Sequence, residues 1–220
     1  MIDSTKIKII SKKPPCVVAN YDVSGLEFCN IVYMCVKQAG SSEYQIPENI
    51  RDLIEQIIPD IYSLSPNLYN DDWTKYCYVT IKKMFIQPHT LGNREGWHID
   101  GFKSDQENFI WSDSDAVPTG VSLGDFELTN DHNRSLSEML EQSYNNFNLQ
   151  LKSNRLYMLD QDCVHRPTSN KTNTSVLRTF IKVTYSKELF NCIGNAWNYK
   201  LPDIKPTKQR FNCRNHSVVY

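Results

Sequence analysis

Short runs of alternating apolar and polar residues, rich in β-branched and aromatic side chains, recur along most of this chain. The longest spans residues 76–86 (YCYVTIKKMFI) and predicts a central strand. Residues 178–185 (RTFIKVTY) alternate with the two-residue period of a strand. Shorter runs of similar composition predict further strands at 7–10, 16–19, 119–128 and 154–160. The pattern therefore indicates a mostly β fold.

Other segments repeat apolar residues at the spacing of a helix. Residues 24–38 begin with a serine that can cap a helix, and a broad apolar stripe follows it. Residues 47–58 begin with a proline, which suits the first helical turn. A capping box predicts a short helix over 135–144. The first two helices are expected to cover the outside of a sheet, whereas the polar stretches 60–75 and 103–118 are expected to form turns and loops.

Length and charge limit the class of protein. The chain has 220 residues, 40% of them hydrophobic, and a net charge of -1. It is long enough for one sizeable core. Its small net charge creates no overall electrostatic field that would favour binding to nucleic acid or to an anionic membrane. No run approaches the ~18 apolar residues of a membrane span. We expect one domain over 1–220, with N-terminal strands and supporting helices at 1–75, a core at 76–187 and a C-terminal segment at 188–220.

Cysteine usage and the N-terminal residues bear on localisation. The seven cysteines are odd in number and contain no C-x-x-C pair. The first residues, MIDSTK, lack the long apolar core of a signal peptide. We therefore expect a cytoplasmic protein with reduced thiols.

A histidine and a carboxylate stand two residues apart in the segment 96–102 (GWHIDGF), as His98 and Asp100. On a strand, residues at this spacing point to the same face, so both side chains could bind one metal ion. A third ligand is offered by His165, and Arg178 follows on the next predicted strand. Two imidazoles and one carboxylate form the facial triad that leaves open positions on Fe(II).

This order, His-x-Asp, then a distant His, then an Arg on a following strand, resembles the Fe(II)- and 2-oxoglutarate-dependent dioxygenases over roughly residues 76–187. The resemblance implies flanking helices around a double-stranded β-helix, a cupin-like jelly-roll of two facing sheets with the metal at one mouth. It implies that His98, Asp100 and His165 are the iron ligands. It also implies that Arg178 binds the distal carboxylate of 2-oxoglutarate through its planar fork.

The same resemblance implies the reaction and further contacts. Fe(II), 2-oxoglutarate and O2 would together hydroxylate a substrate, with release of succinate and CO2. A strand equivalent to 76–86 often supplies a second contact to 2-oxoglutarate, and Tyr78, Thr80 and Lys82 share one of its faces. Arg166 is a rival for the carboxylate, but strand alternation turns it away from the face of its neighbour, His165.

The substrate is not named by any motif. Trp97, Phe102 and Trp111 are candidates to line a substrate pocket, and aromatic packing in a core is the competing interpretation. The loop 103–118 and the insertion 129–150 are expected to select the substrate, and the insertion is either a lid or a plain connection. The substrate could be a small molecule, a peptide side chain or a nucleobase, so nucleic acid is not excluded, whereas a membrane is not expected.

Two other classes of function fit the same pattern. A non-redox cupin-like binding protein could use this fold, because fold does not determine function. A zinc hydrolase is a further alternative, because two histidines and a carboxylate also suit catalytic zinc. Neither alternative accounts for Arg178 as simply as a 2-oxoglutarate enzyme does.

Overall fold

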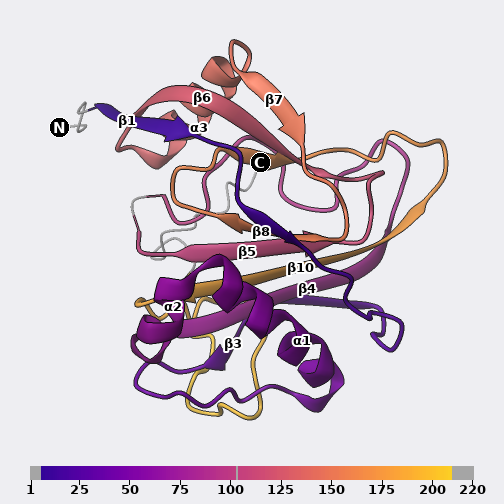
Figure 1. Ribbon diagram of the computed structural model, residues 1–220, viewed down its shortest axis with the longest axis vertical. Coiled ribbons are helices and arrows are strands. Elements are labelled where there is room, and N and C mark those ends of the chain that lie inside the picture. Colours follow the sequence, from indigo (N-terminus) through magenta and orange to yellow (C-terminus); the bar gives the residue numbers. More distant parts are fainter. Residues whose placement is uncertain (1–5, 103, 210–220) are drawn as a thin grey trace.

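In a computed structural model, residues 6–102 and 104–209 are described, and over these ranges the protein is mostly β with two antiparallel sheets (Figure 1). The larger sheet contains, in spatial order, β2 (Cys16–Val18), β8 (Arg155–Leu159), β5 (Glu107–Ser112), β10 (Val176–Ser186), β4 (Tyr76–Ile86) and β3 (Cys29–Lys37). The smaller sheet contains β1 (Lys6–Ser11), β6 (Thr119–Thr129) and β7 (Phe147–Gln150), and β9 (His165–Pro167) also pairs with β6.

One face of the larger sheet packs against helix α1 (Glu48–Leu64), which lies on the side away from the smaller sheet (Figure 1). Strand β10 shows how the sequence achieves this, because its residues alternate between the two faces. Ile181 and Val183 join the core beneath α1, whereas Phe180 and Lys182 line a cavity on the opposite face. The helix contributes apolar residues at helical spacing, namely Ile50, Ile54, Ile57 and Ile61.

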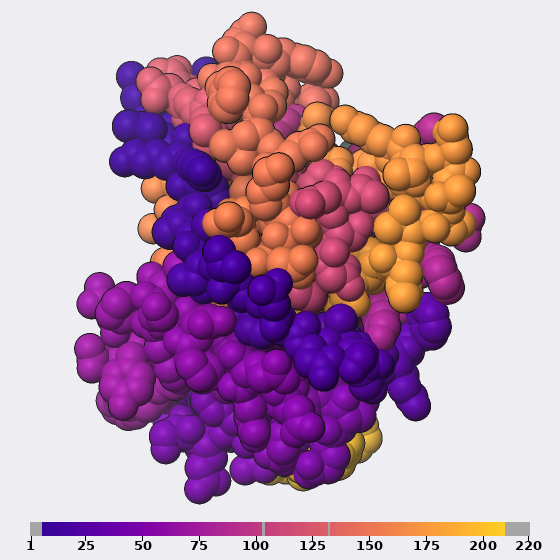
Figure 2. Space-filling view, turned by 45° about the vertical axis from the view of Figure 1, so that its right-hand side comes forward, coloured from indigo at the N-terminus to yellow at the C-terminus, as the bar shows by residue number. Residues whose placement is uncertain are grey.

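A second core fills the space between the two sheets. It joins Ile110 and Leu159 of the larger sheet to Val121 of the smaller one. The N-terminal stretch also ties the sheets together, because β1 pairs with β6 and β2 pairs with β8. Figure 2 shows this indigo stretch crossing the surface between the upper and lower parts of the molecule. The cavity is thus held between two sheets that share a core.

Helix α3 (His132–Ser143) packs on the smaller sheet through Met139, which contacts the cluster containing Phe126 and Leu128. The capping box predicted a start at residue 135, and the structure places the start three residues earlier. The Asp131 side chain accepts the backbone N–H of Arg134 at 2.9 Å, so Asp131 is the N-cap.

Several segments differ from the sequence-based expectations. The helix predicted over 24–38 is wrong, because this region forms β3, which pairs with β4 at the edge of the larger sheet. Its β-branched and aromatic residues suit a strand as well as a helix, and the pairing with β4 decides between them. The turn-rich prediction for 60–75 is also wrong, because α1 continues to Leu64 and is followed by α2 (Pro66–Asp71) and η1 (Asp72–Thr74). The polar stretch 103–118 contains β5.

Other predictions are confirmed. The strand expected at 76–86 has the bounds of β4, and the expected strands at 7–10, 16–19, 119–128 and 154–160 correspond to β1, β2, β6 and β8. The helix expected at 47–58 corresponds to α1. The strands of His165 and Arg178 lie in different sheets, because β9 belongs to the smaller sheet and β10 to the larger one.

The described part of the C-terminal segment, residues 188–209, packs along the edge of the larger sheet. Phe190 contacts the ring of Tyr78, and the Asn198 side chain donates to the carbonyl oxygens of Cys35 and Gln45. The division into segments at 75 and 187 stays a prediction. Among the described helices, none is both long and apolar enough to cross a membrane.

The expectation of reduced thiols holds for part of the chain. The described cysteines that are free are Cys16, Cys29, Cys35, Cys77 and Cys163. Cys192 instead takes part in a disulfide, contrary to that expectation.

Candidate metal centre

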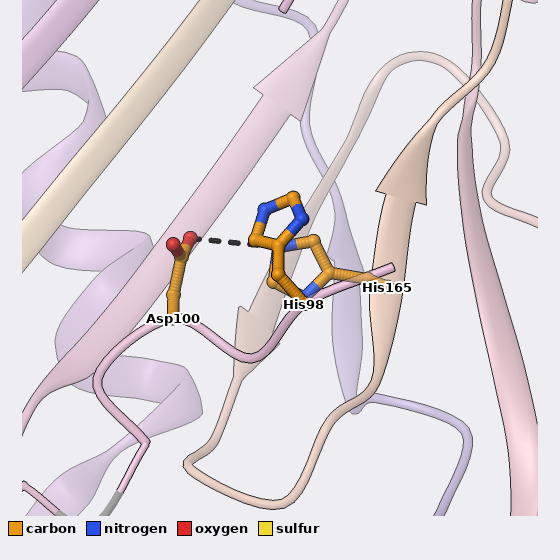
Figure 3. A group of neighbouring side chains, drawn as sticks. All are labelled: His98, Asp100 and His165. Carbon is orange, nitrogen blue, oxygen red and sulfur yellow. Dashed lines mark ion pairs between the residues drawn. The ribbon is translucent and has the colours of Figure 1, made fainter. Parts of the chain in front are cut away.

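Three side chains converge at the edge of the cavity between the sheets, namely His98, Asp100 and His165 (Figure 3). Each offers one ligand atom, and these atoms all lie within 4.8 Å of one another. An isolated antiparallel bridge joins the two histidines, whose backbone N–H groups each donate to the other residue's carbonyl at 2.9 Å. The bridge places the imidazole centroids 4.4 Å apart. Two segments far apart in the sequence therefore form one group of potential ligands.

The segment that carries His98 and Asp100 is not the strand that the sequence predicted. Only His98 takes part in a bridge, and the chain turns at Asp100. Gly101 has a φ of +69°, and a Cβ there would lie 2.6 Å from Ser104 and Gln106 side-chain atoms. Glycine is thus required both by the backbone angle and by the lack of space. The turn directs the Asp100 carboxylate toward the histidines (Figure 3).

Backbone carbonyls orient both imidazoles. His98 Nδ1 lies 3.0 Å from the Gly96 carbonyl oxygen, and His165 Nδ1 lies 3.0 Å from that of Cys163. A carbonyl oxygen only accepts, so each Nδ1 donates a proton to its carbonyl, and each Nε2 is the ring nitrogen left to ligate a metal ion. This is how metal-binding histidines are commonly oriented. The residues present therefore fit a metal ion.

The electrostatics favour the protonation states that bind metals. Burial and the neighbouring His165 lower the pKa of His98 to about 3, so this imidazole is neutral at physiological pH. Burial alone would raise the pKa of Asp100, but the Lys182 ammonium and the histidines hold it well below the usual range. A neutral imidazole and an ionised carboxylate are the forms that ligate a metal.

Lys182 is part of this centre, and the sequence reasoning missed it. Its Nζ donates to Asp100 Oδ2 at 2.6 Å and to the Tyr33 hydroxyl at 3.0 Å. Burial opposes the charge on Lys182, but Asp100 and Tyr33 raise its pKa above the usual value, so it is an ammonium at neutral pH. Arg178, Phe180 and Lys182 stand two residues apart along β10, so they share one face of the strand. Because Arg178 was already expected near the metal, this shared face could have identified Lys182 from the sequence.

The cavity beside the three ligands has a volume of about 400 Å³. Both sheets line it, with Thr119 and Pro167 on one side and Thr80, Lys82 and Phe180 on the other. Helix α3 also contributes Leu136 and Met139, so the insertion 129–150 reaches the cavity. The centre is therefore open to a ligand of moderate size.

The residues expected around the metal have different locations. Lys82 and Phe102 line the cavity, and Lys82 Nζ donates to Asn93 Oδ1 at 2.9 Å. Tyr78 is buried away from the cavity, and its hydroxyl bonds to the backbone of Glu188 and Phe190, so the structure does not support its expected contact with 2-oxoglutarate. Arg178 is buried, and its Nε donates to Ser112 Oγ at 3.2 Å.

The two tryptophans proposed for a substrate pocket lie in cores instead. Trp97 is 3% exposed and packs with Phe126 and Val164, while the Arg166 guanidinium lies 4.4 Å above its ring. Trp111 is 2% exposed, and its indole N–H donates to the Ala19 carbonyl. Packing accounts for both rings, because each fills space between apolar neighbours and the indole N–H of Trp111 is satisfied.

Comparison with known proteins gives limited similarity. No protein-family model and no curated protein matches the chain. Solved structures similar to it include the non-heme alpha ketoglutarate dependent carbocyclase SnoK from nogalamycin biosynthesis, with 14% identity and a TM-score of 0.42. The match covers 64% of this chain, which spans 59% of the length of SnoK.

Two further matches are the non-heme monooxygenase ThoJ and the protein EvdO2, both at similarly low identity. The ThoJ–Ni complex has 13% identity and a TM-score of 0.35, and the match covers 63% of this chain and 54% of that one. EvdO2 from Micromonospora carbonacea var. aurantiaca, complexed with 2-oxoglutarate, has 12% identity and a TM-score of 0.30, and the match covers 69% of this chain and 76% of that one. At these TM-scores the matches carry no argument about function, which rests on the residues of the site.

Proposed function

We propose that the protein is an Fe(II)- and 2-oxoglutarate-dependent dioxygenase that hydroxylates a substrate, with its two sheets forming the walls of a jelly-roll. The observation that supports this proposal is the group of three ligand atoms, from His98, Asp100 and His165, within 4.8 Å of one another beside a cavity. Two imidazoles and one carboxylate are the donor set of non-haem Fe(II) oxygenases. The cationic side chains around the cavity suit an acidic co-substrate.

Iron would be held by the two imidazoles and by the carboxylate of Asp100. When bound, it would supply the oxidation of the substrate by O2, coupled to conversion of 2-oxoglutarate into succinate and CO2. The chain's own residues orient the ligands. The carbonyls of Gly96 and Cys163 hold the imidazoles, and Lys182 holds the carboxylate.

Two cations are candidates for the distal carboxylate of 2-oxoglutarate. Lys82 lines the cavity directly, on β4 opposite Phe180 of β10. Arg178 lies one step further along the same face of β10, with its guanidinium 4.8 Å from the Phe180 ring. Burial lowers the pKa of Arg178 to about 10, so it remains a cation at neutral pH.

The loop before the metal ligands contacts both of these cations. Asn93 of this loop accepts from Lys82. A Cβ on the preceding Gly92 would lie 2.8 Å from Arg178 Nη1, so the backbone of the loop passes close to the guanidinium. No carboxylate of the described residues lies within ion-pair distance of Arg178. We propose that Arg178 binds the distal carboxylate and that Lys82 assists it.

The proposal is tested with purified protein, Fe(II), ascorbate and 2-oxoglutarate in air. Succinate is expected to form slowly alone and faster with the true substrate, which can be sought among amino acids, peptides and nucleosides. His165→Ala is expected to abolish succinate formation. Lys8→Met, an exposed substitution distant from the cavity, serves as the matched control and should leave it unchanged.

Two results would contradict the proposal. If calorimetry under nitrogen shows that the iron-loaded protein does not bind 2-oxoglutarate, a binding protein of the cupin type becomes the better interpretation. Alternatively, zinc-loaded protein that hydrolyses a substrate without 2-oxoglutarate or O2 would identify a zinc hydrolase.

A further inference from the structure

Tyr33 has a backbone conformation that bulky residues rarely adopt. Its φ of +48° lies in the left-handed region, which is strained for a tyrosine. The pairing of β3 with β4 shifts register between Ile31 and Met34, so Tyr33 sits in an irregular stretch of the strand. Its N–H donates to Thr80 Oγ1 at 3.0 Å. Such bulges re-aim a side chain, and that of Tyr33 lines the cavity.

Lys182 links the hydroxyl of Tyr33 to the metal centre. Lys182 Nζ donates to the Tyr33 oxygen and to Asp100 Oδ2, which uses two of its three N–H groups. Tyr33 accepts this bond, so its own O–H proton is not used in it. Among the described residues, no acceptor for that proton lies within hydrogen-bond distance. Two adjacent donors, one of them a buried cation, therefore face the cavity.

We infer that Tyr33 and Lys182 form a subsite for a carboxylate of the primary substrate. Asp100 already pairs with the charge of Lys182, so the match rests on the two neighbouring donors, namely the third N–H of Lys182 and the O–H of Tyr33. Two such donors fit the two oxygens of a carboxylate. The strained backbone of Tyr33 is explained by this role, because the bulge presents the hydroxyl beside the ammonium.

The position of the subsite separates it from the 2-oxoglutarate contacts proposed above. Lys182 touches Asp100, so a group bound there lies beside the metal ligands. Lys82 lies opposite Phe180, two residues from Lys182 along β10, or about 7 Å. The two lysines can thus bind two different anionic groups. The assignment to the primary substrate rests on the proposed function, and it places the oxidised carbon close to the substrate's carboxylate.

Binding of a carboxylate can be tested without metal, so that no metal ion can hold the probe. Benzoate is titrated into the metal-free protein and followed by the backbone amide signals of Tyr33 and Lys182, with neutral benzamide as the comparison. Benzoate is expected to bind saturably and at least about fivefold more tightly than benzamide. Tyr33→Phe, which keeps the ring and the backbone, should weaken benzoate by about tenfold, the scale of a hydrogen bond to a charged group.

Lys182→Met should abolish saturable binding, and Tyr69→Phe, an exposed tyrosine on α2, should change nothing. Because Lys182→Met leaves Asp100 without its ion-pair partner, Tyr33→Phe provides the test that does not depend on the stability of that variant. Equal binding of benzoate to wild-type protein and Tyr33→Phe would overturn the subsite.

The source of the carboxylate is distinguished with zinc-loaded protein. The affinity for 2-oxoglutarate, measured by calorimetry, is expected to stay within about twofold in Tyr33→Phe, and benzoate should still bind when 2-oxoglutarate is saturating. A tenfold loss of 2-oxoglutarate affinity, with displacement of benzoate, would instead assign the subsite to the co-substrate and overturn this inference. Succinate formation without benzoate binding would refute only the subsite. Benzoate binding without succinate formation would refute only the proposed function.

Discussion

The imidazole of His98 makes the stability of the metal-free protein depend on pH. Burial and His165 lower the pKa of His98 from 6.5 to about 3. Below pH 6.5 the unfolded chain therefore binds a proton that the folded protein excludes, so stability falls as the pH falls through this window. From this residue we expect the free energy of unfolding to fall by about 1–2 kcal/mol between pH 7 and pH 5.

Urea denaturation of metal-free protein at both pH values measures this change, and His98→Gln provides the comparison. Glutamine does not titrate, so the variant should lose less stability than the wild type over the same range. An equal loss in both proteins would show that His98 is not the group responsible.

Arg178 offers a second prediction at the residue scale. Replacing it by lysine keeps the charge but loses the planar fork that binds a carboxylate through two parallel hydrogen bonds. We expect Arg178→Lys to weaken 2-oxoglutarate binding by roughly 1–3 kcal/mol, measured by calorimetry under nitrogen. Arg166→Lys is a matched control, because Arg166 lies over Trp97 outside the cavity. A large loss in Lys82→Met with none in Arg178→Lys would assign the distal carboxylate to Lys82.

At the scale of elements, α3 depends on its N-cap. Asp131 accepts the N–H of Arg134, and the helix presents Leu136 and Met139 to the cavity. Asp131→Ala should reduce the free energy of unfolding by about 1 kcal/mol, the usual contribution of such a cap. Urea denaturation measures this, with the exposed Ser137→Ala as a control. A similar loss in both variants would mean that the cap contributes no more than an ordinary surface position of the helix.

For the whole molecule, a bound metal would join parts of the chain that are far apart. His98 and His165 come from different segments, and Asp100 is paired with Lys182 of the larger sheet. The unfolded chain cannot hold these ligands together, so metal binding should stabilise the fold. At a free metal concentration of 100 times Kd, the gain is about 2.7 kcal/mol.

Thermal unfolding with and without Mn(II) measures this stabilisation. His165→Ala should show no rise in Tm, whereas His89→Asn, an exposed histidine with a positive φ that asparagine tolerates, should rise like the wild type. A rise in Tm that survives in His165→Ala would place the metal elsewhere on the chain.

Local patterns predicted a large part of both the fold and the metal centre. The β4 segment combines strand-forming residues along its whole length, and α1 repeats isoleucines at helical spacing, so each element was readable without its neighbours. The His-x-Asp pair and the distant histidine were recognisable because the donor chemistry of a metal site is a property of the residue types. Their convergence in space agrees with that expectation, although the segment around Asp100 is a turn.

The tertiary structure alone decided the features that depend on pairing between distant segments. Residues 24–38 suited a helix by local pattern, and only the ladder with β4 made them the strand β3. The same pairing forms the bulge that turns Tyr33 into the cavity, and register with β4 and β5 places Lys182 beside Asp100. The sequence by itself determined which residues could ligate a metal and which runs could form strands, because those are local properties. Which side chains surround the metal centre follows from register and side-chain direction across the sheet, and these are determined only when the strands pair.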